Sequence, residues 1–251
     1  MEHNRREYDL VIFGVTGFTG RLVAEYISHK YGSGNSLKWA IAGRNSEELS
    51  KICKDHSLKS LGQPASIITA DSLDKVSLSR MVKKTKVICS TVGPYAKYGT
   101  KLVESCIENK TDYCDISGEV QWIRKLIHSY NEKAINNKVR IVNSCGFDSI
   151  PSDFGVWYVQ RNMRQRYGVS ANYVRCRIKK LRGSASGGTI ASMLNIIDDL
   201  KKDRKLLREV KDPYSLNPVG TAQGLDKWDQ RGAIFDRDFQ CWTIPFIMAG
   251  V

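Results

Sequence analysis

The feature that most constrains the fold is a glycine-rich stretch near the N-terminus. Gly14, Gly17 and Gly20 follow a short apolar run at 10–13 and open a segment with helical spacing at 20–28. Between a strand and a helix, glycines permit a tight turn, close approach of a ligand to the backbone and close packing of helix on strand. The helix N-terminus adds free N–H groups and a positive dipole. The chain is therefore predicted to begin with a βαβ unit that binds a phosphate-bearing ligand.

The alternation of short apolar runs with helical patterns continues to about residue 143. We predict strands at 10–13, 39–42, 66–69, 86–91, 113–116 and 140–143. The helices between them are predicted at 20–28, 46–56 (capped by Ser46), 73–84, 100–109 and 120–137. Strands separated by helices imply right-handed crossovers and a parallel sheet covered on both faces. The predicted fold class is α/β, with a Rossmann-type doubly wound parallel sheet.

The pattern changes after residue 146, and we place the start of a second domain at about Pro151. Residues 1–150 are predicted to form a dinucleotide-binding domain, and residues 151–251 a partial α+β substrate or catalytic domain. This second part is predicted to contain helices at 154–166 and 189–208 and an alternating, half-buried strand at 172–182. The chain is apolar from Trp242 to Val251, whereas a complete domain usually ends in polar residues. We therefore expect the second domain to be truncated at its C-terminus.

Composition excludes several classes of protein. No run of 18 apolar residues occurs, so no membrane-spanning helix is predicted. The first apolar run leads directly into the glycine loop, which indicates a strand and not a signal peptide. The seven cysteines are an odd number without a C-x-x-C pair. We therefore predict no disulfide framework, no metal site and an intracellular, reducing compartment.

The net charge of +13 is concentrated in the second part of the chain. Residues 161–211 contain 14 basic and 4 acidic residues, a net charge of +10. Such a stretch is either a solvated face or a surface for an anionic lipid or a nucleotide. A basic face is predicted on the helix at 189–208, from Lys201, Lys202, Arg204, Lys205 and Arg208. We expect weak peripheral contact with an anionic membrane or lipid droplet, and no nucleic-acid partner because no such motif is present.

Cofactor-binding candidates lie at the carboxyl ends of the predicted strands. Arg44 follows the second strand, where an NAD enzyme carries Asp or Glu for the ribose hydroxyls. An arginine there suits a 2′-phosphate, so we predict NADP, with NAD as the alternative. Asp71 is expected near the adenine, and the turn at 91–95 near the nicotinamide. The predicted cofactor-binding residues are Gly14, Thr16, Gly17, Phe18, Thr19, Gly20, Arg44, Asp71, Thr91, Gly93 and Pro94.

Catalytic candidates come from the same turn and from two further loops, at 115–119 and 143–153. The candidates are the hydroxyl of Tyr95 and the carboxyl groups of Glu119, Asp148 and Asp153. Asp148 and Asp153 can instead cap turns and the next helix. Cys145 is either a nucleophile or a buried thiol at a strand end. The first role needs a general base, usually histidine, and none of His3, His29, His56 and His128 lies in a suitable loop.

Five segments together resemble the saccharopine dehydrogenase-like oxidoreductase family. They are 14–20, 42–44, 91–95, 112–119 and 146–153, and the resemblance runs from about Tyr8 to the end of the chain. The apolar end at 242–249 resembles a family segment that normally continues further. The family includes saccharopine reductases and the trans-acting enoyl reductases of glycolipid biosynthesis.

The resemblance implies NAD(P)-dependent hydride transfer to a small-molecule or lipid-linked substrate. It also implies association with lipid droplets, mitochondria or other membranes. It assigns cofactor residues better than catalytic ones. Because a cofactor loop can persist after catalysis is lost, the alternative is a catalytically inactive nucleotide-binding or lipid-surface scaffold.

Overall fold

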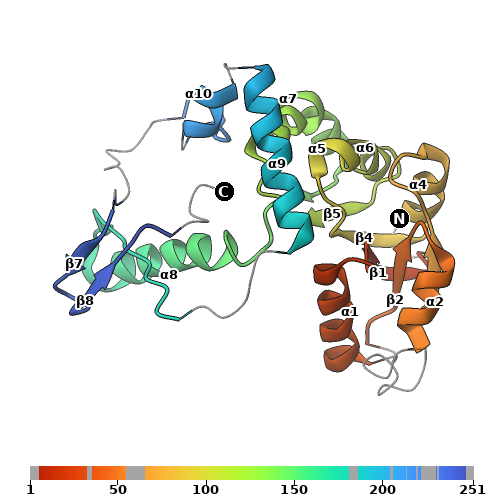
Figure 1. Ribbon diagram of the computed structural model, residues 1–251, viewed down its shortest axis with the longest axis horizontal. Coiled ribbons are helices and arrows are strands. Elements are labelled where there is room, and N and C mark those ends of the chain that lie inside the picture. Colours follow the sequence, from red (N-terminus) through yellow and green to blue (C-terminus); the bar gives the residue numbers. More distant parts are fainter. Residues whose placement is uncertain are drawn as a thin grey trace.

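The computed structural model describes residues 6–32, 36–54, 66–180, 186–203, 206–212, 214–218, 220–221, 230 and 232–246. Its N-terminal half is built on a six-stranded parallel sheet with the order β3-β2-β1-β4-β5-β6 (Figure 1). The strands are β1 Tyr8–Phe13, β2 Trp39–Gly43, β3 Ser66–Thr69, β4 Thr85–Ser90, β5 Asp112–Asp115 and β6 Ile141–Val142. The order reverses between β1 and β4, which confirms the doubly wound sheet. A crevice for a ligand forms outside the carboxyl ends of the strands at such a reversal.

Helices cover both faces of this sheet (Figure 1). They are α1 Phe18–Tyr31, α2 Ser46–Lys54, α4 Lys75–Val82, α5 Tyr95–Tyr98, α6 Thr100–Glu108 and α7 Val120–Asn137. Neighbouring residues of β1 pack into separate clusters: Ile12 with residues of α1 and α2, and Val11 with residues of α4, α6 and α7. Both side chains are fully buried. This two-sided burial explains why the strands are short, continuous apolar runs.

The described residues of the C-terminal part form no such core. This part contains α8 Ile150–Tyr167, α9 Gly187–Lys202, α10 Leu206–Lys211 and an antiparallel pair, β7 Ile234–Asp236 and β8 Cys241–Thr243. Among the described residues, none of the buried hydrophobic ones lies beyond Val139. In its place, the buried Asp236 carboxylate forms ion pairs with Arg175 (3.2 Å) and Arg177 (3.1 Å). Figure 1 shows α8, β7 and β8 at one side and α9 close to α5 and α7.

Two predictions for this part are wrong. Residues 172–180 form no strand, and residues 181–182 lie outside the described residues. Their alternation has another cause, since two of the alternating arginines, Arg175 and Arg177, turn towards Asp236 and no neighbouring strand pairs with the segment.

The predicted helix at 189–208 is two helices, because Asp203 has the extended conformation (φ −135°, ψ 101°) that ends α9. The predicted basic face is therefore not continuous, and Arg204 and Lys205 lie outside the described residues.

Smaller differences concern short elements. Ser46 is the first residue of α2, and the cap is Asn45, whose Oδ1 accepts the N–H groups of Glu47 (3.0 Å) and Glu48 (3.2 Å). The four-residue α5 and the strands β7 and β8 were not predicted, because so few residues show no periodicity.

Within the part of the chain that the structure describes, no helix is long and apolar enough to cross a membrane.

Candidate cofactor site

The glycine loop between β1 and α1 needs glycine at two of its three positions. Gly14 has φ +103°, a conformation that side chains rarely adopt. A Cβ at Gly20 would lie 2.2 Å from the carbonyl oxygen of Gly14, so the helix packs on the loop more closely than any other residue allows. At Gly17 the nearest atom to a Cβ would be 3.4 Å away, and the residue is exposed. The space outside Gly17 is therefore open to a ligand.

The first turn of α1 presents unpaired amides to this space. The N–H of Gly17 donates to the carbonyl of Gly14, and the N–H of Arg21 donates to the carbonyl of Gly17, both at 3.0 Å. For Phe18, Thr19 and Gly20, no acceptor of the backbone N–H occurs among the described residues. Three amides at a helix N-terminus fit a pyrophosphate, because they add hydrogen bonds to the positive end of the helix dipole. Thr16 is exposed beside them.

Arg44 lies at the end of β2 with an exposed side chain, and no partner for its guanidinium occurs in the described part of the chain. It can therefore meet a phosphate in the crevice. Asp71, beyond the neighbouring β3, is occupied locally: its carboxylate accepts the N–H of Leu73 (2.8 Å), and its own N–H donates to Ser77 Oγ (3.0 Å). Of these two predicted residues, Arg44 has the more exposed side chain, and the role of both in cofactor binding stays a prediction.

Thr91 follows β4, and its hydroxyl contacts the glycine loop. Its hydroxyl lies 3.1 Å from the carbonyl oxygen of Phe13 and 3.2 Å from that of Gly14. The hydroxyl therefore holds the glycine loop against β4. The turn that follows, Val92–Pro94, leads into α5 at the point where the strand order reverses.

The structure brings two of the four catalytic candidates together, Tyr95 and Glu119. The Tyr95 hydroxyl donates to the carbonyl of Ser90 (3.2 Å), and burial raises the pKa of this phenol far above its ordinary value. Glu119 is fully buried, and its carboxylate accepts three hydrogen bonds within the protein. In this arrangement both side chains are hydrogen-bonded within the protein.

The other two candidates lie beyond β6. Asp148 is in the loop that leads to α8, and burial raises the pKa of its carboxyl. Asp153 is exposed in the first turn of α8, where its negative charge interacts favourably with the positive end of the helix dipole. The catalytic role of all four residues stays a prediction.

Asp115, for which the sequence suggested no role, organises the loops at this edge. Its buried carboxylate accepts the Tyr113 hydroxyl (2.8 Å), the Asn143 amide (2.8 Å) and the N–H groups of Ser117 (3.0 Å) and Ser144 (3.1 Å). Burial raises the pKa of Asp115, and these hydrogen bonds offset part of the increase. An acid at the buried carboxyl end of a parallel strand was the available signal.

Three thiols lie near Asp115. Cys89 of β4 and Cys114 of β5 are register partners, and a hydrogen bond from the Cys114 thiol lowers the pKa of Cys89. Cys145 is half-buried, with its sulfur 3.5 Å from the carbonyl oxygen of Val142. Burial raises the pKa of Cys145, which favours a structural thiol over a nucleophile.

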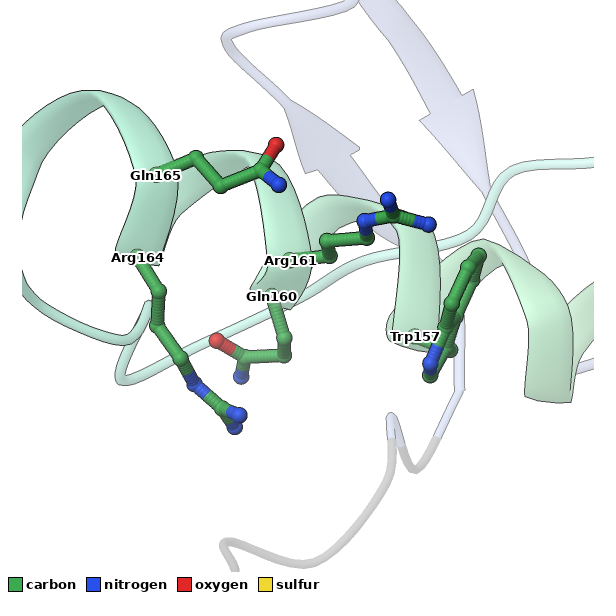
Figure 2. Close-up of a pocket in the computed structure, with 5 residues that line it drawn as sticks. All are labelled: Trp157, Gln160, Arg161, Arg164 and Gln165. Carbon is green, nitrogen blue, oxygen red and sulfur yellow. The ribbon is translucent and has the colours of Figure 1, made fainter.

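A hollow of about 340 Å³ lies elsewhere, on α8. Figure 2 shows its lining side chains, Trp157, Gln160, Arg161, Arg164 and Gln165, all from this one helix. The Arg161 guanidinium stacks over the Trp157 ring at 5.2 Å. Because one helix supplies all of its lining, the hollow has no opposing wall and is not the cofactor site.

A parallel sheet that reverses order beside such a glycine loop defines a dinucleotide-binding protein of the Rossmann type. Residues 10–142 match the family described as the saccharopine dehydrogenase NADP binding domain. The chain belongs to this saccharopine dehydrogenase-like oxidoreductase family, which confirms the resemblance and the prediction of NADP as cofactor.

Two relatives show how much of a longer protein the chain represents. A saccharopine dehydrogenase-like oxidoreductase of Bos taurus is 34% identical over 100% of this chain and 59% of its own length. A trans-acting enoyl reductase of Mycobacterium tuberculosis is 35% identical over 86% of this chain and 51% of its own length. The chain thus spans little more than half the length of these relatives.

Among solved structures, the Saccharomyces cerevisiae saccharopine dehydrogenase (L-Glu forming) is similar with a TM-score of 0.48 and 20% identity. The match covers 64% of this chain and 32% of that one.

Proposed function

We propose that this chain binds NADP(H) as part of a reductase that acts on a small-molecule or lipid-linked substrate. The observation that carries the proposal is the set of three unpaired amides at the start of α1, at the same sheet edge as the unpartnered Arg44. When bound, the cofactor supplies the hydride. The protein residues supply binding and orientation.

Each part of the cofactor has residues that fit it. The amides of Phe18, Thr19 and Gly20 would hold the pyrophosphate, and Arg44 the 2′-phosphate. The turn Val92–Pro94, next to the glycine loop, would border the nicotinamide, since ligands gather where the strand order reverses.

An exposed apolar face lies on one side of α9. Ile190, Leu194 and Ile197 share one side of this helix at helical spacing, and each is about half exposed. The opposite side of the same helix approaches the nicotinamide turn, because Ser192 Oγ would lie 3.5 Å from a Cβ on Gly93, so the apolar face points away from that turn. The relative named as an enoyl reductase supports a carbon–carbon double bond as the group reduced. Peripheral contact with an anionic membrane is part of this proposal, supported by the exposed Lys201 and Lys202.

Replacing Arg44 tests the 2′-phosphate role. Arg44→Ala should weaken NADPH binding by about 1–3 kcal/mol, the value of a charge-assisted contact. NADH has no 2′-phosphate, so its affinity should hardly change. Titration of cofactor fluorescence measures both, with Lys51→Ala, an exposed lysine of α2, as the control for lost positive charge. Equal losses for the two cofactors would contradict the proposal.

The internal hydrogen bonds of Tyr95 and Glu119 favour one alternative, a nucleotide-binding scaffold without turnover. NADPH binding combined with no oxidation across carbonyl, imine and enoyl compounds would support it.

A further inference from the structure

Glu119 joins three segments of the chain that are far apart in sequence. Its carboxylate is fully buried, which is costly unless each oxygen is hydrogen-bonded. Oε1 accepts the N–H of Tyr95 (2.7 Å) and the hydroxyl of Ser192 (3.0 Å), and Oε2 accepts the N–H of Ala96 (2.9 Å). The carboxylate is therefore a fixed acceptor, with all three donors supplied by the protein.

Two of these three donors lie directly after the nicotinamide turn. The amides of Tyr95 and Ala96 are the first two of α5, directly after the turn Val92–Pro94. Glu119 is itself held in place, because its N–H donates to Ser117 Oγ (3.1 Å) beyond β5. The turn is thus fastened to the loop after the neighbouring strand of the sheet.

The third donor comes from the C-terminal part of the chain. Ser192 lies on α9, on the side of the helix opposite the apolar face described above. Its hydroxyl contacts Glu119 and also lies next to Gly93. One hydrogen bond therefore connects α9, in the C-terminal part, with the carboxylate that holds the end of the proposed nicotinamide turn.

We propose that Glu119 and Ser192 are positioning residues that hold the turn Val92–Pro94 in place for the nicotinamide half of the cofactor. The inference rests on the proposed binding of NADP(H). It assigns neither residue a proton transfer. It predicts that loss of the contact affects nicotinamide binding and leaves the binding of adenosine and phosphates unchanged.

Two probes separate these halves: NADPH, and 2′-phospho-ADP-ribose, which has the same phosphates and adenosine but no nicotinamide. Each is titrated into the full chain and into Ser192→Ala and Glu119→Gln. We expect NADPH affinity to fall about fivefold in the first variant and tenfold or more in the second, as for loss of hydrogen bonds to a charged group. The affinity for 2′-phospho-ADP-ribose should not change.

Two further variants provide controls. Ser192→Thr keeps the hydroxyl and should restore NADPH affinity, whereas Met193→Ala changes an exposed residue of the same helix and should not affect it. Bound NADPH should also show altered nicotinamide fluorescence in Ser192→Ala alone among the α9 variants.

Equal losses for both probes in Ser192→Ala, or no loss in either, would overturn the inference, even if Glu119→Gln fails to fold. Wild-type protein that binds neither probe would overturn the proposed function and this inference with it. Wild-type protein that binds both, with unchanged variants, would overturn the inference alone.

Discussion

At the scale of single residues, the three loop glycines have different functions that a sequence pattern cannot separate. A Cβ at Gly20 would lie 2.2 Å from a backbone oxygen, whereas at Gly17 the nearest atom is 3.4 Å away. Gly20→Ala should therefore lower the free energy of unfolding by about 2–4 kcal/mol, because neither helix nor loop can yield.

Gly17→Ala is the matched control, and it should cost less than about 1 kcal/mol. It should weaken NADPH binding instead, because its methyl group occupies the space open to the pyrophosphate. Urea unfolding and cofactor titration measure the two effects. Equal destabilisation by both substitutions would be inconsistent with this division of roles.

Cys145 offers a test based on pH. Its pKa is raised by burial, so the reactive thiolate forms only at a higher pH than in an ordinary thiol. At pH 7.5, iodoacetamide should label Cys145 about tenfold or more slowly than the exposed Cys176 and Cys241, and labelling should accelerate as the pH rises. Site-resolved mass spectrometry gives the rates. Rapid labelling of Cys145 at pH 6.5 would indicate an activated nucleophile.

At the scale of secondary structure elements, the sequence predicts the sheet well and its polar contacts poorly. β3 and α7 have the predicted bounds. In α7 the apolar residues recur at helical spacing, and this spacing marks the face that is buried. The link between Glu119 and Ser192 spans 73 residues, and no local pattern indicates it. Glu119 was therefore predicted as catalytic, although its carboxylate is satisfied inside the protein. Similarly, the alternation at 172–180 resembled a strand because ion pairs to Asp236 have the same spacing.

The cap of α2 shows how a neighbouring residue changes such a prediction. Asn45, and not Ser46, accepts the amides of Glu47 and Glu48. Asn45→Ala should cost about 1 kcal/mol of stability, whereas Ser46→Ala should be close to neutral. Thermal unfolding of the two variants compares them directly. A larger effect at Ser46 would show that Ser46, and not Asn45, is the residue that caps α2.

At the scale of the whole molecule, the two parts of the chain differ in what stabilises them. The part up to residue 142 buries both faces of a sheet, and the part beyond it relies on ion pairs and on contacts such as Ser192 with Glu119. This difference follows from the sequence, whose regular alternation ends near residue 146. The division into domains at 1–150 and 151–251 stays a prediction, and an exchange experiment can test it.

Helices α7 and α8 are a matched pair for this test, because both have 18 residues. α7 buries Trp122, Ile123 and Leu126, each worth roughly 2 kcal/mol, whereas no residue of α8 is buried. Local opening should therefore cost far less in α8, and its amides should exchange with deuterium about 10³-fold faster than those of α7. Mass spectrometry of the two peptides measures the rates, with β1 as the reference for the slowest exchange. If α8 exchanges as slowly as α7, its exposed face is covered in solution, and the second part of the chain has a core of its own.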